Sequence, residues 1–177
     1  DKESVTCVTI FSEAYPSKLK DLELPPYSLF CKGDISLLKS KCFGIVGTRV
    51  PTAYGRTVTQ NFAKGLAENG LTIVSGLAMG VDKIAHETTL DCGGKTIAVL
   101  GGGFNHIYPA MNENLAKRIV EKGLLVSEYR PSVRPTAYNF PVRNRIIAGL
   151  SDGILITEAG EKSGALHTNE YSLECGR

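Results

Sequence analysis

Short apolar runs alternate with helical patterns from residue 42 to the end of the chain. Five runs are rich in β-branched residues and end in glycine or small polar residues, as is typical of strands buried on both faces. They are Phe43–Val46, Leu71–Val74, Thr96–Leu100, Leu124–Ser127 and Gly153–Thr157. Helical patterns lie between them and after the last. This alternation predicts an α/β, Rossmann-like fold with a mostly parallel sheet and helices on both faces.

The expected helices begin and end at recognisable signals. The first ends at Asn69-Gly70, and its apolar positions Val58, Phe62, Gly65 and Leu66 predict the buried face. The later helical patterns cover residues 81–92, 112–122, 141–150 and 164–175. Pro141 suits the first turn of its helix, where no backbone N–H is needed.

Residues 1–41 differ from the rest and form a short N-terminal preface. Val5–Ile10 and Ser28–Cys31 are candidate strands, separated by proline-rich turns. We expect this preface to pack against the main domain, residues 42–177. Because the chain stops just after a helical pattern, we expect that domain to be truncated before its last strand, as in a fragment of a longer protein.

Composition narrows the possible functions only slightly. The 177 residues suit one domain, and a net charge of +2 does not by itself predict nucleic-acid binding. Five cysteines stand far apart without a CxxC pair, which favours reduced thiols in a cytoplasmic protein. No run is long and apolar enough for a membrane span, so we expect no membrane association.

Generic cofactor and metal motifs are absent. The first strand–helix turn reads GTR rather than GxGxxG, and Gly94-Lys95-Thr96 precedes a strand rather than the helix of a phosphate loop. His86-Glu87 lacks the second histidine of HExxH, and no cysteine or histidine spacing suits a metal. We therefore expect no cofactor and no metal.

Four strand ends or helix starts are suited to an anion. They are Gly47-Thr48-Arg49, Ser75-Gly76, Gly101–Gly103 and Ser163-Gly164. Exposed backbone N–H groups and helix dipoles at such turns favour phosphate. Any single turn is explained as well by a glycine that permits a tight bend. Arg49 adds a guanidinium that is costly to bury without a partner, so a phosphate is the expected one.

The second candidate is the segment Asn139–Arg145, with the sequence NFPVRNR. It places Arg143, Asn144 and Arg145 at a helix start, where positive charges oppose the dipole unless an anion binds. Phe140 lies at the loop–helix junction and can stack on a base. The alternatives are a hydrophobic staple for Phe140 and internal ion pairs, with Glu158 for example, for the arginines.

The motifs together resemble those of one family. GIVGTR, SGLAMGVD with its trailing AH, LGGGFNHIYPAMNENLA and FPVRNRIIAGLS closely resemble the DprA/Smf (DNA processing protein A) family. The preface YPSKLKDLELPPYSLFCKGDISLL also resembles that family, so the resemblance covers nearly the whole chain.

This resemblance implies a cytoplasmic protein with an extended Rossmann-like fold that binds single-stranded DNA. It also implies that the protein is not an enzyme and has no catalytic residue. Such proteins protect DNA during natural transformation in competent cells, load the RecA recombinase onto it for DNA recombination, and are homodimers at full length. The implied phosphate pocket includes Arg49 and Ser75-Gly76, and Phe140 matches a base-contacting position. Gly164 and Thr168 match the small-residue helix start that closes the pocket.

Two other functions stay open at this point. Nucleotide phosphoribohydrolases of the lysine decarboxylase-like type share the fold class but carry PGGxGT, where this chain has TEAGEKSGALHT. Glu158 and Glu170 are nearby carboxylates that would serve such an enzyme as acid or base. The other alternative is a sensor of a small nucleotide with no role on DNA.

Overall fold

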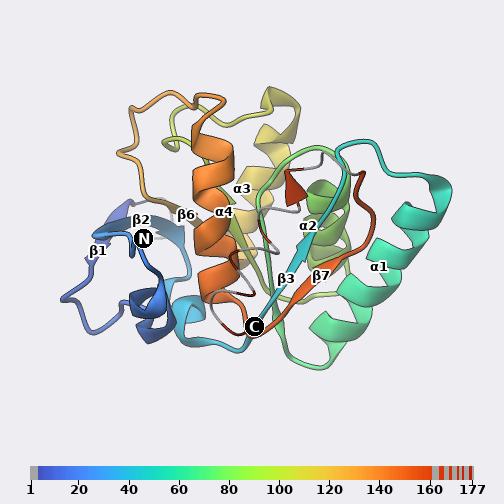
Figure 1. Cartoon of the computed structure of the whole chain (residues 1–177), viewed down its shortest axis with the longest axis horizontal. Coiled ribbons are helices and arrows are strands. Elements are labelled where there is room, and N and C mark those ends of the chain that lie inside the picture. Colours follow the sequence, from blue (N-terminus) through green and yellow to red (C-terminus); the bar gives the residue numbers. More distant parts are fainter. Residues whose placement is uncertain are drawn as a thin grey trace.

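The computed structural model describes residues 4–160 together with Gly164, Ala165, Thr168, Tyr171, Leu173 and Gly176. Within these residues, seven strands form one sheet in the order β1-β2-β6-β5-β4-β3-β7 (Figure 1). The strands are β1 (Thr6–Thr9), β2 (Ser28–Gly33), β3 (Cys42–Val46), β4 (Thr72–Ser75), β5 (Thr96–Leu100), β6 (Leu124–Ser127) and β7 (Ile154–Ile156). The α-helices are α1 (Ala53–Glu68), α2 (Val81–Asp91), α3 (Glu113–Lys122) and α4 (Asn139–Leu150).

The five predicted strands form the parallel part of the sheet. The chain runs outward from β3 through β4 and β5 to β6, then returns through α4 to place β7 on the other side of β3. The predicted α/β, Rossmann-like fold is therefore confirmed. In such sheets ligands bind at the carboxyl ends of the strands where the order reverses, which here is the end of β3.

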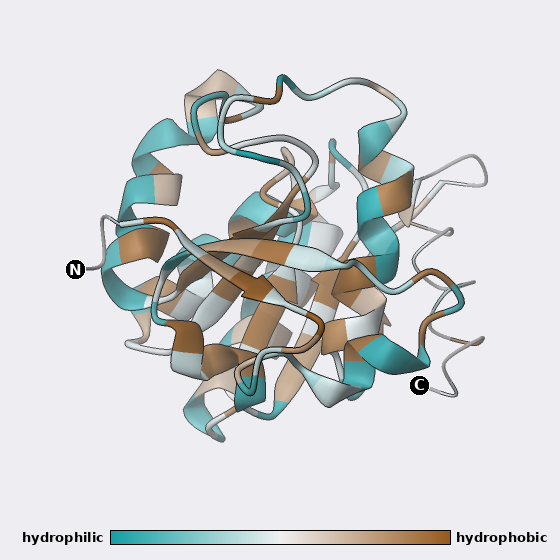
Figure 2. Ribbon diagram, turned by 90° about the vertical axis from the view of Figure 1, so that its left-hand side faces the viewer, coloured by the Kyte–Doolittle hydropathy of each residue, from teal (hydrophilic) through white to brown (hydrophobic). Residues whose placement is uncertain are grey.

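Successive strand residues point to opposite faces and build separate cores. Ile45 and Ile73 pack with α1 and α2 on one face, where Leu125 also joins α3 in a neighbouring cluster. Val74 and Ile97 point to the other face, which α4 covers. Figure 2 shows hydrophobic residues along the central strands and hydrophilic residues on the outer helices.

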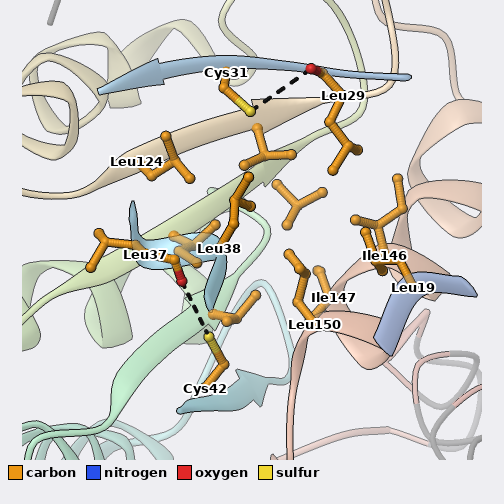
Figure 3. Close-up of a cluster of buried hydrophobic side chains, with 14 of the residues drawn as sticks. Leu19, Leu29, Cys31, Leu37, Leu38, Cys42, Leu124, Ile146, Ile147 and Leu150 are labelled. Atoms are coloured by element: carbon orange, nitrogen blue, oxygen red, sulfur yellow. Dashed lines mark hydrogen bonds between the residues drawn. The ribbon is translucent and has the colours of Figure 1, made fainter. Parts of the chain in front are cut away.

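The α4 face also holds the preface. Short 3-10 helices at Ser17–Asp21 and Ile35–Lys39 pack there, and Leu19 lies against Ile146 and Ile147 of α4 (Figure 3). The strand β2 pairs antiparallel with β6, and β1 pairs antiparallel with β2, so both strands extend the same sheet. The division into a preface (1–41) and a main domain (42–177) stays a prediction.

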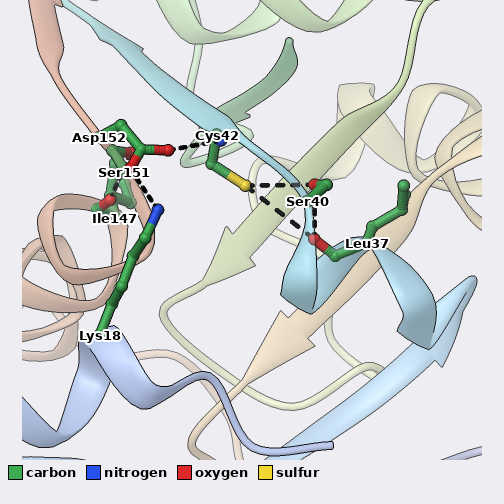
Figure 4. A network of polar contacts seen from close by, with 7 residues as sticks. All are labelled: Lys18, Leu37, Ser40, Cys42, Ile147, Ser151 and Asp152. Carbon is green, nitrogen blue, oxygen red and sulfur yellow. Dashed lines mark hydrogen bonds and ion pairs between the residues drawn. The ribbon is translucent and has the colours of Figure 1, made fainter. Parts of the chain in front are cut away.

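A polar contact joins the preface to the beginning of β3. Asp152, just after α4, accepts a hydrogen bond from the Cys42 N–H at 3.1 Å and forms an ion pair with Lys18 (Figure 4). The Cys42 thiol lies 3.5 Å from the Ser40 hydroxyl, and burial raises its pKa. Asp152 therefore anchors β3 to both α4 and the preface.

Two helix predictions need correction. The buried positions of α1 are Gly55, Thr59, Ala63 and Ala67, whereas Phe62 is 50% exposed. Small residues face inward because α1 packs closely: a Cβ on Gly55 would lie 1.9 Å from a Glu158 carboxylate oxygen. The helix α4 begins two residues before Pro141, so Phe140 lies inside its first turn.

The described helices include none that is both long enough and apolar enough to cross a membrane.

Candidate nucleic-acid interface

A cavity of about 570 Å³ opens at the carboxyl end of β3, beside the first turn of α4. This is the position that the reversal in strand order favours for a ligand. The lining comes from the turn after β3, the start of α2, the start of α4 and the segment near residue 164. It includes eight predicted site residues: Gly47, Thr48, Arg49, Phe140, Arg143, Asn144, Gly164 and Thr168.

Arg143 is the fixed cation at the cavity wall. Its side chain runs from α4 into the sheet and is 5% exposed. The guanidinium donates from Nη1 to the carbonyl of Gly76 at 2.7 Å and also to the carbonyl of Val99. It lies so close to Gly76 that a Cβ there would be 2.5 Å from Nη2. Gly76 is therefore needed for the close approach of Arg143.

A buried carboxylate accompanies this cation. Asp82, in the first turn of α2, is 6% exposed and accepts hydrogen bonds from the N–H groups of Gly76 and Ala78. Burial raises the pKa of Asp82, and the Arg143 charge acts in the opposite direction. Burial lowers the pKa of Arg143 to about 10, so its guanidinium is still protonated at neutral pH.

A chain of hydrogen bonds links Arg143 to the far wall. Its Nε donates to the side-chain oxygen Oδ1 of Asn144 at 3.1 Å, and the side-chain Nδ2 of Asn144 donates to the Gly164 carbonyl at 3.2 Å. Thr168 is fully buried at the cavity, and its hydroxyl has no hydrogen-bond partner among the described residues. A buried polar atom without a partner is costly unless a ligand or water satisfies it.

Arg49 is exposed, whereas the sequence predicted a buried guanidinium. Its side chain is exposed at the mouth of the cavity, whereas the buried arginine is Arg143. The expectation that Arg49 is buried is therefore wrong, because the turn after β3 bends the chain out to solvent. Among the described residues, no carboxylate forms an ion pair with Arg49, so its charge is available to a ligand.

The turn Gly101–Gly103 is covered by the chain itself, which corrects its assignment to an anion. A Cβ on Gly101 would lie 2.8 Å from the Phe140 ring, and one on Gly102 would lie 2.8 Å from the Pro135 nitrogen. The Gly103 N–H donates to the Val133 carbonyl at 2.8 Å. These glycines accommodate the loop of residues 128–138.

Three predicted residues do not line this cavity. Arg145 pairs with Glu128 at 2.7 Å and donates to the Leu24 carbonyl at 3.1 Å, so it faces the preface. Ser75 is fully buried and donates to the Ile45 carbonyl, which fixes β4 to β3. Gly76 lines a smaller adjoining hollow. Ser163, the remaining predicted residue, lies outside the described residues.

Two other features carry little signal in the sequence. Asp82 lies in the motif SGLAMGVD, but nothing near it in sequence indicates that its carboxylate is buried beside Arg143. Among the residues that the structure describes, Glu158 forms no ion pair with an arginine: its carboxylate accepts hydrogen bonds from the N–H and hydroxyl of Thr52, at 3.0 Å each, at the start of α1. Within the described part of the chain, no three histidine, cysteine or acidic side chains are grouped as metal ligands.

Comparison with known proteins now places the chain in a family. The DNA recombination-mediator protein A family matches residues 6–177. The DNA processing protein DprA of Bacillus subtilis (strain 168) is 45% identical over 177 residues, covering 99% of this chain and 60% of the relative. The chain thus spans about three fifths of that protein.

Solved structures give the same picture. DprA from Streptococcus pneumoniae has a TM-score of 0.94 and 42% identity, covering 98% of this chain and 61% of the other. DprA from Helicobacter pylori, described for its single-stranded DNA binding mode, has a TM-score of 0.89 and 34% identity, covering 98% of this chain and 78% of the other. A molybdenum cofactor binding protein from Rippkaea orientalis, at 17% identity, a TM-score of 0.55 and coverage of 77% of this chain and 72% of the other, shares the fold alone. On this evidence the chain belongs to the DNA recombination-mediator protein A family, that is, to the DprA/Smf proteins.

Proposed function

We propose that the cavity at the end of β3 binds a backbone phosphate of single-stranded DNA. The observation that carries this proposal is the pairing of an exposed guanidinium, Arg49, with a fixed one, Arg143, at a single cavity. The Thr168 hydroxyl, which has no hydrogen-bond partner within the described part of the chain, supplies a donor beside them. Asp82 offsets the Arg143 charge, so the net attraction comes from Arg49.

The aromatic wall supports an unpaired strand as the ligand. Phe140 lies at the cavity with the Arg143 guanidinium carbon 6.0 Å from its ring centre. A base has a π-face that stacks on such a ring only when it is not enclosed in a duplex. We therefore propose Gly47, Thr48, Arg49, Asn144, Gly164 and Thr168 as phosphate-side contacts, Arg143 with Gly76 as their support, and Phe140 as a base contact.

The cellular role follows from the family rather than from the cavity. We propose that the full-length protein is a cytoplasmic homodimer that loads RecA onto single-stranded DNA during natural transformation, without catalysing a reaction. The family description as a recombination mediator and the name of the Helicobacter pylori relative support this role. Loading is measured as RecA strand exchange on DNA already coated with single-strand binding protein, with and without the full-length protein.

The phosphoribohydrolase alternative has less support. Its proposed acid or base, Glu158, is hydrogen-bonded to Thr52 at the start of α1, and its side chain is not placed as a free group in the cavity. Glu170 lies outside the described residues. Incubation with nucleoside monophosphates tests this alternative directly, and release of free base would favour it over the DNA-binding proposal.

Binding by fluorescence anisotropy tests the main proposal. A labelled single strand should bind more tightly than its duplex, with an affinity that falls steeply as salt increases, because phosphate contacts release counterions. A chelator should leave the affinity unchanged, since backbone amides and arginines suffice for phosphate. Equal affinity for duplex, or binding that salt does not weaken, would contradict the proposal.

A further inference from the structure

A second hollow adjoins the phosphate cavity and shares four residues with it: Arg49, Ala78, Phe140 and Arg143. Its other lining residues are Gly76, Met79, Tyr108 and Pro109. The hollow has a volume of only about 30 Å³, so it is too shallow to enclose a ligand. It is suited instead to a flat group that lies against its surface.

The surface of this hollow is apolar and accessible. Tyr108 is 54% exposed and Met79 is 39% exposed, although both belong to hydrophobic residue types. The Tyr108 ring packs on the Phe140 ring, with centres 5.4 Å apart and planes tilted by 44°. These rings are too close together to admit a base between them, so a base would stack on the exposed surface of Tyr108.

A buried hydrogen bond holds the two walls of the hollow in position. Asn112, four residues after Tyr108, is fully buried, and its amide donates to the Leu77 carbonyl at 2.9 Å and to the Ala78 carbonyl at 3.3 Å. The segment that carries Met79 is thereby fixed to the segment that carries Tyr108. The hollow is formed before any ligand binds, which reduces the entropy lost on binding.

We propose that Tyr108 and Met79 form a binding site for an unpaired nucleobase, directly beside the phosphate cavity. This inference rests on the proposed function and assigns the neighbouring base to a named surface. The residues shared by the two sites place a base on Tyr108 within reach of a strand whose phosphate lies between Arg49 and Arg143. A thioether and an aromatic ring both accept any base, so no sequence preference is expected.

Three substitutions at Tyr108 separate the possible roles of its ring. Tyr108→Phe keeps the π-face, Tyr108→Leu keeps apolar bulk against Phe140 but has no π-face, and Tyr108→Ala removes both. Each is measured with a short oligothymidine and with a strand of equal length that is abasic at every position. Tyr27→Ala is the matched control, since Tyr27 is 65% exposed and lines neither hollow.

The proposal expects a loss that depends on the base. Tyr108→Leu and Tyr108→Ala should weaken oligothymidine binding by about 5- to 150-fold, the range for one base–aromatic stack. They should leave binding of the abasic strand unchanged, as should Tyr108→Phe on both strands and Tyr27→Ala throughout. Thermal melting should match the wild type, because the Tyr108 side chain is largely exposed.

Other results would overturn the base site and would show whether the phosphate site survives. If Tyr108→Leu binds oligothymidine like the wild type while Arg49→Ala weakens both strands, the phosphate proposal stands and the base site fails. If Tyr108→Leu weakens both strands equally, the ring shapes the phosphate cavity instead. Unchanged DNA binding with impaired RecA loading would assign Tyr108 to a protein partner. If the wild-type protein binds neither strand, the proposed function itself fails.

Discussion

The turns after β3 and β5 look alike in sequence and differ in what approaches them. Gly47-Thr48-Arg49 lines an open cavity, with Arg49 exposed at its mouth. Gly101–Gly103 follows β5, which is separated from β3 by one strand of the same sheet, yet Phe140 and residues 130–135 cover it. At one turn a ligand is expected to approach the backbone, and at the other the protein's own chain already does.

This difference shows that a glycine in a turn indicates close approach of another group to the backbone. It does not indicate whether that group is a ligand or another part of the protein. The long loop after β6 covers the turn after β5 and leads into α4. The Arg143 side chain of α4 then extends to Gly76, next to the open cavity. The covered turn is therefore a structural support for the open one. Four substitutions distinguish residues that stabilise the fold from residues that are proposed to contact DNA.

The largest effect is expected for Arg143→Ala. Its removal leaves the carbonyls of Gly76 and Val99 without their donor and leaves the buried Asp82 without its nearby positive charge. Breaking such a buried arrangement lowers the free energy of unfolding by about 3–5 kcal/mol. Urea denaturation without DNA measures this change. An unaltered midpoint would show that Arg143 is not a structural support.

The next largest effect concerns binding rather than folding. Arg49→Ala should reduce the affinity for single-stranded DNA by about 1.5–3 kcal/mol, as for a hydrogen bond to a charged group. It should also reduce the slope of log affinity against log salt by about 0.7, because one phosphate contact is lost on a single strand. Anisotropy titrations at several salt concentrations measure both.

The melting temperature provides the control for Arg49. Because this side chain is exposed and forms no ion pair among the described residues, its removal should leave melting unchanged. Normal DNA binding with a lower melting temperature would reverse the assignment and make Arg49 part of the fold.

A smaller effect on stability is expected for Gly103→Ala at the covered turn. The added Cβ would lie 2.1 Å from the Arg130 carbonyl oxygen, so the loop must move away. Overpacking of this kind lowers the free energy of unfolding by about 1–3 kcal/mol. Gly70→Ala is a useful reference, since no heavy atom lies within 4 Å of a Cβ there and only its positive φ of 80° is strained. Equal losses in the two variants would show that the loop does not constrain Gly103.

The last prediction concerns the slope of stability against pH, at most about 1.4 kcal/mol per pH unit, and tests whether the interior around His86 is shielded from water. His86 is fully buried, and burial, with a smaller effect of Arg143, lowers its pKa to about 3. The Thr96 hydroxyl donates to the Ile73 carbonyl, so His86 donates to it from Nδ1 and is neutral. Since the folded pKa of His86 lies below the unfolded value of about 6.5, protonation of this histidine favours the unfolded state. The stability that the neutral histidine contributes is therefore fully present above pH 6.5 and is lost as pH falls toward 3.

Denaturant titrations of the wild type and His86→Asn across this pH range isolate the histidine. The Asp82 pKa is raised by burial, so its contribution has the opposite sign and is lost as pH rises, but it is shared by both proteins. The difference between the two proteins should therefore shrink as pH falls. A difference independent of pH would mean that His86 is already protonated or accessible in the folded state.

The sequence was sufficient to predict the strands and most of the cavity lining. Runs such as Thr96–Leu100 have the composition and length of buried strands, and β5 has these bounds. Local signals determine such elements, and parallel strands bring their carboxyl ends to one edge. The grouping of Arg143 with Asn144 was likewise evident from the motif.

Features that depend on contacts between distant segments were not predictable. Nothing near Gly103 in sequence shows that Pro131 lies over it, and nothing near Arg49 shows that its side chain is exposed. The prediction of the buried face of α1 was wrong for a related reason. Gly55 is buried because the Glu158 side chain lies close to it, and a pattern of hydrophobic residues does not identify a buried glycine.

The carboxylate of Glu158 at the start of α1 has a consequence for competition in the cell. In dinucleotide-binding folds the bare N–H groups of the first helix hold a pyrophosphate. Here the Thr52 N–H, at the equivalent helix start, already donates to a negatively charged side chain. The phosphates of ATP and nicotinamide dinucleotides, which are abundant metabolites, would meet a like charge at this position, whereas the DNA phosphate is proposed to bind on the Arg49 side of the cavity.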